Sequence, residues 1–158
     1  MKLKPVLLLA TLAACLLSGC YLNGGLYPVQ GPLAARTPPP VLHARMSGAF
    51  NSGHLTVTML DGEVCKGEWD MVNRMQTQGS QKDAAPGPNL SSDWDIVYGQ
   101  GFYNATILGS RLHVHSILTG NKGTTLYVEL YRPDTPNGLN EIKGVATDNN
   151  GNVYKLTF

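Results

Sequence analysis

Residues 54–69 read HLTVTMLDGEVCKGEW and predict a β-hairpin. In the first half, apolar side chains recur at every second position, which is the period of a strand with one buried face. Asp61-Gly62 then supplies a two-residue turn, because both residue types tolerate the positive φ that hairpin turns require. In the second half, Cys65 and Trp69 share one face and the charged side chains share the other, so we expect Cys65 and Trp69 to pack inward.

Similar runs recur along the rest of the chain, and no segment shows a convincing helical period. Together with the hairpin they give about eight strands, most of them joined by short turns that contain glycine or asparagine. Such connections are typical of antiparallel sheets that close or pack face to face. The sequence therefore predicts an all-β domain, either a small antiparallel barrel or a two-sheet sandwich. The further predicted strands are 94–98, 102–108, 112–118, 124–131, 141–147 and 153–158.

The first twenty residues have the pattern of an export signal. A lysine-containing start precedes an apolar run of about 12 residues, from Val6 to Leu17, whereas a membrane-spanning helix needs about 20. The run ends in Leu17-Ser18-Gly19-Cys20, which resembles the lipobox of bacterial lipoproteins.

This resemblance implies cleavage between Gly19 and Cys20, a diacylglyceryl group on the Cys20 thiol and an N-acyl chain such as palmitate on the new amino group. Anchoring by three acyl chains is stable, because two lipid signals already suffice. Tyr21 stands where an aspartate would mark retention in the inner membrane, so the outer membrane is the expected location, with the domain facing the periplasm or the outside. No cofactor other than this covalent lipid is expected.

The chain divides into three predicted parts. Residues 1–19 are the signal peptide, and residues 20–45, rich in Pro and Gly, read as an extended tether. Residues 46–158 form the all-β domain. Within it, the polar stretch 73–93 is predicted as a long mobile loop.

Composition excludes some classes of partner. Processing would leave 139 residues, with ten basic against eleven acidic side chains and no cluster of Lys or Arg. We therefore expect no nucleic-acid partner and no electrostatic attraction to an anionic membrane surface. Of the three cysteines only Cys65 would stay free, which excludes an intramolecular disulfide, and we expect Cys65 to be buried.

A metal site has only weak candidates. His113 and His115 lie two residues apart on a predicted strand and so project from one face. Zinc needs three or four ligands, and no third ligand can be identified by spacing. Because the apolar neighbours occupy the other face, we expect both histidines to point into water and predict no metal.

Other candidates for chemistry have structural explanations. Residues 148–152 resemble the start of a calcium loop but lack its later glycine and glutamate, so they read as a hairpin turn. Asp93 and Asp95 flank Trp94 and could act as an acid–base pair, although residues at a strand entrance are usually solvated turn residues. No Gly-x-Ser-x-Gly motif is present. We predict that the protein is not an enzyme, with a thiol enzyme or small hydrolase using Cys65 as the alternative.

Tyr127, Glu129 and Tyr131 share one face of a predicted strand and form a candidate binding surface. Packing against neighbouring strands or filling of the barrel is the preferred explanation of the two tyrosines. The closing alternation Tyr154, Leu156, Phe158 resembles the last strand of outer-membrane β-barrels, but the other predicted strands carry charged and polar residues on the faces that would meet lipid.

Two motifs of the mature domain are similar to those of small uncharacterised Gram-negative lipoproteins, from which no activity transfers. They are Asp61-Gly62-Glu63-x-Cys65-x-Gly67-x-Trp69 and the closing segment 144–154. Size and location also resemble lipid-anchored lysozyme inhibitors, although those usually contain a disulfide. The expected function is a lipid-anchored, non-catalytic β-domain that binds a protein or glycan partner in the envelope or on a host.

Overall fold

The computed structural model describes residues 21–49, 52–71, 87–108, 110, 113–133 and 141–158. In these ranges lie eight β-strands, one α-helix and one short π-helix. Their bounds are β1 Tyr21–Gln30, β2 Leu42–Ala49, β3 Ser52–Thr58, β4 Val64–Met71, α2 Ser91–Tyr98, η1 Tyr103–Ile107, β5 His113–Gly120, β6 Thr125–Tyr131, β7 Lys143–Asp148 and β8 Val153–Thr157.

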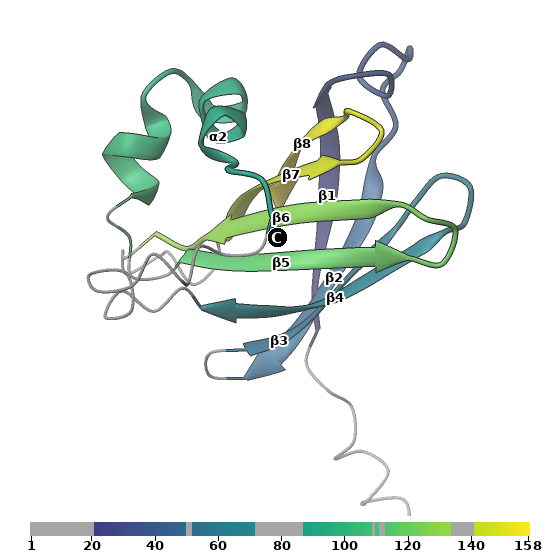
Figure 1. The fold of residues 1–158 in the computed structure, drawn as a ribbon, viewed down its shortest axis with the longest axis horizontal. Coiled ribbons are helices and arrows are strands. Elements are labelled where there is room, and N and C mark those ends of the chain that lie inside the picture. Colours follow the sequence, from purple (N-terminus) through teal and green to yellow (C-terminus); the bar gives the residue numbers. More distant parts are fainter. Residues whose placement is uncertain (1–20, 50–51, 72–86, 109, 111–112, 134–140) are drawn as a thin grey trace, which may run out of the picture.

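The strands form a closed antiparallel barrel (Figure 1). Each strand pairs with the next along the chain, and β1 closes the sheet by pairing with β8, with Leu26 opposite Leu156. The all-β prediction is confirmed, and of its two forms the barrel is the one observed. Closure leaves none of the eight strands with an unpaired edge.

The interior of the barrel is filled by the apolar face of every strand. Cys65 and Trp69 point inward as predicted, and the Trp69 Nε1 donates a 3.0 Å hydrogen bond to the Ser47 carbonyl oxygen. The strand alternation explains this core, because side chains at every second position face the same side. Its buried members are Leu26, Leu42, Ala44, Met46, Leu55, Val57, Cys65, Trp69, Val114, Leu118, Leu126, Val128, Leu130, Ala146, Tyr154 and Leu156.

The predicted tether over residues 20–45 is wrong for the part that the structure describes. Residues 21–30 are β1, and β2 starts at Leu42. Pro28 fits into β1 because the pairing with β8 shifts register between Pro28 and Gln30, and a bulge is where a strand tolerates proline. Gly24 is required for packing, since a Cβ there would collide with the Thr157 carbonyl oxygen and the Phe158 ring. Gly24 thus serves barrel closure, although such glycines also resemble a linker in the sequence.

Two other predicted strands are helical. Residues 94–98 belong to α2 and residues 103–107 form η1, and both helices stand outside the barrel wall (Figure 1). Leu90, Trp94 and Val97 are spaced by four and three residues, which is a helical period within a run short enough to be mistaken for a strand. Gly99, with a φ of 109°, ends α2. Of the predicted loop 73–93, residues 73–86 lie outside the described residues, while residues 91–93 are the first turn of α2.

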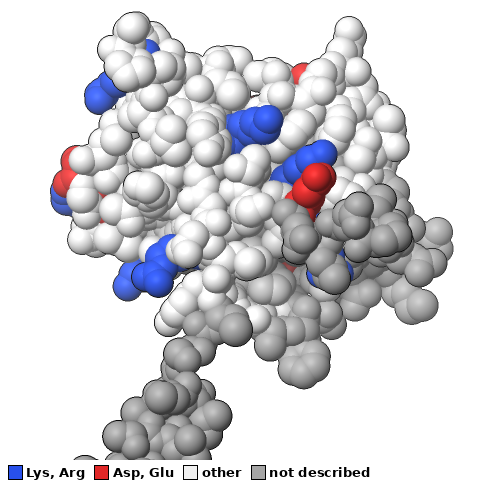
Figure 2. Space-filling model, turned by 180° about the vertical axis from the view of Figure 1, so that it is seen from behind, with Lys and Arg blue, Asp and Glu red and all other residues white. Residues whose placement is uncertain are grey.

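The two ends of the barrel contain different strand ends and turns. We call the end where β1 begins, at Tyr21 opposite Ser47, the proximal end. β5 also begins there, at His113 opposite Tyr131. The distal end contains the turns 59–63, 120–124 and 149–152. On the face opposite to the view of Figure 1, the Lys and Arg side chains do not merge into one continuous patch (Figure 2).

Candidate functional site

Three side chains with metal-ligating or acid–base chemistry meet on the outer face of β5 and β6. His115 lies directly opposite Glu129 in the pairing of the two strands, and His113 projects from the same face two residues earlier. His113 Nε2 is 3.2 Å from Glu129 Oε2, and His115 Nδ1 is 3.4 Å from Glu129 Oε1. One carboxylate therefore contacts both imidazoles.

The helix α2 supplies a fourth member and covers the group. Trp94 Nε1 donates a 2.6 Å hydrogen bond to Glu129 Oε2. The Trp94 side chain is fully buried and stacks on Tyr98 and Phe102, with ring centroids 5.4 and 6.0 Å away. We call His113, His115, Glu129 and Trp94 the Glu129 cluster.

An apolar layer around the Glu129 cluster holds α2 against the barrel wall. Leu90, Ile107 and Val145 are buried there together with Trp94, and Tyr127 and Tyr131 pack on them. This second core covers Val145, Tyr127 and Tyr131 on the outer face of β6 and β7. Glu129 and His113 are accordingly buried, while His115 is partly exposed.

Burial and hydrogen bonding act against each other on the charges of the cluster. Burial by itself raises the pKa of Glu129, but hydrogen bonds from His113 and Trp94 and the nearby imidazoles outweigh it, so the pKa lies below its ordinary value. Burial lowers the pKa of His115, which favours the neutral imidazole. The pKa of Asp93 is raised by burial and by the charge of Glu129. The anionic form of Glu129 is the one that the cluster is built to hold.

The expectation that both histidines point into water is wrong. The side chain of His113 is 11% exposed and that of His115 is 29% exposed, because α2 and its neighbours cover this face. The carboxylate that spacing could not identify as a third candidate ligand is that of Glu129, which lies on the next strand. Among the described residues, these three offer ligand atoms that all lie within 4.8 Å of one another.

The candidate surface of Tyr127, Glu129 and Tyr131 is not an open one. The Glu129 side chain is 4% exposed, and the two tyrosines are partly buried against the layer under α2. The tyrosines do pack, but on a layer outside the barrel in which, of the described residues, only Val145 belongs to a neighbouring strand. Sequence reasoning found the right face of β6 but not the helix that covers it.

Asp93 and Asp95 do not form a carboxylate pair. They are two residues apart on α2, and side chains at that spacing do not face each other on a helix. Asp95 Oδ1 instead accepts a hydrogen bond from the Tyr103 backbone N–H at 3.1 Å, and such backbone bonds lower the pKa of Asp95. Its contact is therefore a structural link between α2 and η1.

Cys65 lies inside the barrel. Its side chain is fully buried, as predicted, and burial together with the charges of Glu63, Asp61 and Asp148 raises the pKa of the thiol to about 11. A nucleophilic cysteine needs a lowered pKa and access to substrate. These surroundings do not favour thiol chemistry.

The segment 148–152 is a hairpin turn, as predicted. Both carboxylate oxygens of Asp148 accept hydrogen bonds from this turn and the next strand, including a 2.6 Å bond from the Tyr154 hydroxyl and a 2.8 Å bond from the Asn152 side chain. Because protein donors already occupy the carboxylate, its arrangement is that of a structural turn.

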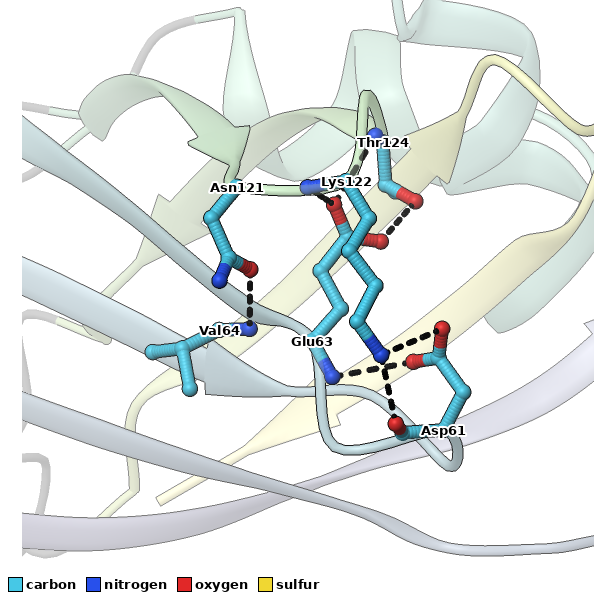
Figure 3. Close-up of polar contacts among 6 residues, drawn as sticks. All are labelled: Asp61, Glu63, Val64, Asn121, Lys122 and Thr124. Atoms are coloured by element: carbon cyan, nitrogen blue, oxygen red, sulfur yellow. Dashed lines mark hydrogen bonds and ion pairs between the residues drawn. The ribbon is translucent and has the colours of Figure 1, made fainter.

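A second buried carboxylate ties two turns together at the distal end (Figure 3). Glu63 accepts hydrogen bonds from the Lys122 and Thr124 backbone N–H groups at 2.6 and 3.1 Å and from the Thr124 hydroxyl at 2.5 Å. Lys122 Nζ donates to the Asp61 carbonyl oxygen and carboxylate at 2.7 and 3.2 Å. These contacts fix the turn between β3 and β4 against the turn between β5 and β6.

Comparison with protein-family models, with curated proteins and with solved structures finds no match to this chain. No helix within the described residues has both the length and the apolar character needed to span a membrane. Gly19 and Cys20, the predicted cleavage and lipidation residues, lie outside the described residues. In contrast to these two residues, the Glu129 cluster is a candidate site whose geometry the structure describes.

Proposed function

We propose that this protein is a lipid-anchored lipoprotein of the cell envelope, held at the outer membrane through Cys20, whose non-catalytic barrel binds a protein or glycan partner. The lipobox-like segment Leu17-Ser18-Gly19-Cys20 supports the anchor, as argued from the sequence. One structural observation supports the way in which the barrel would be presented: Tyr21, the residue after Cys20, is already the first residue of β1.

An anchor at Cys20 would leave almost no free chain between lipid and barrel. One residue of extended chain spans at most about 3.3–3.6 Å, so the proximal end would lie at the headgroups of the bilayer. The barrel would therefore be a module held against the membrane rather than one displayed on a long tether.

The side chains at the start of β1 suit this position. Tyr21 is 55% exposed and Leu22 is 49% exposed, and the Arg45 guanidinium lies 4.6 Å from the centre of the Tyr21 ring. Tyrosine at the headgroup level, with a cationic side chain beside it, is a common arrangement at a membrane interface.

The closed barrel limits how a partner can bind. Since all eight strands are paired on both sides, a partner cannot add a strand to the sheet and must contact side chains and turns. The buried Cys65 does not favour the alternative of a thiol enzyme. The likeness to lysozyme inhibitors stays a prediction.

The anchor is tested by metabolic labelling of cells with an alkyne analogue of palmitate. The full chain is expected to incorporate the label and fractionate with membranes, and Cys20→Ser is expected to lose both properties. Cys15→Ser and Cys65→Ser are matched controls that should keep them. Labelled or membrane-bound Cys20→Ser protein would overturn the anchor.

The orientation is tested with single fluorophores on engineered cysteines. Ser52 is exposed at the proximal end and Asn150 is exposed in a distal turn, so Ser52→Cys and Asn150→Cys each place one fluorophore at a known end. In vesicles that contain spin-labelled lipid, the proximal fluorophore should be quenched more strongly. Equal quenching at both ends would contradict a barrel that stands on its proximal end.

Partner binding is tested in intact cells with a photo-crosslinking residue in place of Asn150, which is exposed in a distal turn. A discrete adduct that disappears in the Cys20→Ser background is expected. Absence of any adduct at this and at neighbouring distal positions would count against the binding module.

A further inference from the structure

We propose that His113, His115 and Glu129 form a binding site for a divalent transition-metal ion, with zinc as the best fit. The three donor atoms come from two adjacent strands and lie within 4.8 Å of one another. This site is independent of the proposed anchor and of the proposed partner binding.

The distances from Glu129 match the spacing of ligands around zinc. Zinc bonds to imidazole nitrogen and to carboxylate oxygen are about 2.0–2.2 Å, so two ligands of a tetrahedral ion lie about 3.3–3.5 Å apart. The observed separations are 3.2 Å from His113 Nε2 to Glu129 Oε2 and 3.4 Å from His115 Nδ1 to Glu129 Oε1. An ion can therefore enter between these atoms with small side-chain rotations.

The surrounding residues hold the ligands in place. Glu129 Oε2 accepts the 2.6 Å hydrogen bond from Trp94 Nε1, which fixes the carboxylate and leaves further lone pairs for an ion. Such a hydrogen bond to a ligating carboxylate is the usual outer support of a metal site. The two histidines stand on a strand of the closed barrel, so their backbone positions are set before any ion binds.

Burial distinguishes these residues from histidines scattered on a surface. Glu129 is 4% exposed and His113 is 11% exposed, whereas His115 is 29% exposed and gives the ion a route from solvent. A buried carboxylate beside two imidazoles, one of them partly exposed, is an environment that a cation stabilises.

The donor set selects the class of metal. Two imidazole nitrogens and one carboxylate suit zinc and related first-row ions, while calcium and magnesium require mostly oxygen ligands. Cys65 points into the barrel, on the opposite side of the wall, so it adds no thiolate. Three protein ligands leave a position on the ion for water or for a group supplied by a partner.

The test is calorimetric titration of zinc chloride into the full chain, purified in detergent without a polyhistidine tag and stripped with a chelator. We expect one zinc per chain, and at least tenfold weaker binding in His115→Gln and in Glu129→Gln. His43→Gln and His54→Gln are matched controls, because they remove exposed histidines of β2 and β3 and should leave the affinity unchanged.

A second readout reports the coordination itself. Cobalt(II) bound in place of zinc should show the intense visible absorption of a four- or five-coordinate ion, and Glu129→Gln should lose it. Circular dichroism checks that each variant is folded. If a variant does not fold, the zinc titration of the wild-type chain alone tests the proposal.

Three results would overturn the proposal. They are a flat zinc titration of the wild-type chain, stoichiometric binding that persists in His115→Gln and Glu129→Gln, or binding that is lost in the two control variants instead.

Discussion

Trp94 Nε1 lies 2.6 Å from Oε2 of Glu129, so a side chain of α2 donates a hydrogen bond to a carboxylate on the outer wall of the barrel. The two residues are 35 positions apart in the sequence. Their contact is the polar centre of the layer that joins the helix to β6.

Trp94→Phe should destabilise the fold while keeping an aromatic ring at this position. A hydrogen bond to a charged group contributes about 1.5–3 kcal/mol, and the smaller ring also leaves a gap in a fully buried site. We expect the free energy of unfolding to fall by about 2–4 kcal/mol, measured by urea unfolding and circular dichroism in metal-free buffer.

Ile96→Ala is the matched control for this measurement. Ile96 is 47% exposed on the same helix, so the change should stay within about 0.5 kcal/mol of the wild type. If Trp94→Phe were as small in effect as Ile96→Ala, the bond to Glu129 would not stabilise the packing of α2.

Glu63 should make the stability of the barrel depend on acid pH. The hydrogen bond from the Thr124 hydroxyl lowers the pKa of Glu63 below its ordinary value of 4.5, against the opposing effect of burial. A carboxylate with a lowered pKa stabilises the fold above its unfolded pKa, and this contribution is lost as pH falls through the folded pKa. The stability difference between the wild type and Glu63→Gln should therefore shrink as pH is lowered from 6 toward 3.

Urea midpoints at a series of pH values measure this effect. Glu68→Gln removes a charge at an exposed position of β4, away from the distal turns, and serves as the control. Parallel pH curves for the wild type and Glu63→Gln would show that the contacts of Figure 3 do not hold the charged carboxylate.

Cys65 should react slowly with thiol reagents in the folded protein. A rise of the pKa from 9.0 to about 11 lowers the thiolate fraction near neutral pH about hundredfold, and burial restricts access further. The rate of maleimide labelling, followed by mass spectrometry, should be at least about a hundred times higher in urea than in native buffer.

A reference thiol at an exposed position calibrates this rate. Thr58→Cys in a Cys65→Ala background places a cysteine at an exposed site of β3 and should label rapidly without denaturant. Labelling of native Cys65 at the same rate would contradict its burial and would revive the thiol enzyme.

Local patterns in the sequence predicted the parts of the fold that depend on neighbouring residues. Residues 54–69 form β3, a turn and β4 as expected, although Met59 pairs with Glu63 and the turn is therefore wider than the predicted two residues. The turn at Asn150-Gly151 joins β7 to β8. In both cases strand alternation and turn chemistry act within a few residues, so they are visible without the rest of the chain.

Only the tertiary structure decided the rest, because the interactions concerned join distant parts of the chain. β1 is a strand despite its glycines and Pro28 because β2 and β8 pair with it, and Gly24 leaves room for Phe158. A short apolar run such as residues 91–98 fits either a helix or a strand. It is a helix here because Trp94 packs on the barrel wall. The sequence by itself placed His113 and His115 on one face, but the register between β5 and β6 brings Glu129 to them, and strand register is set by the whole barrel.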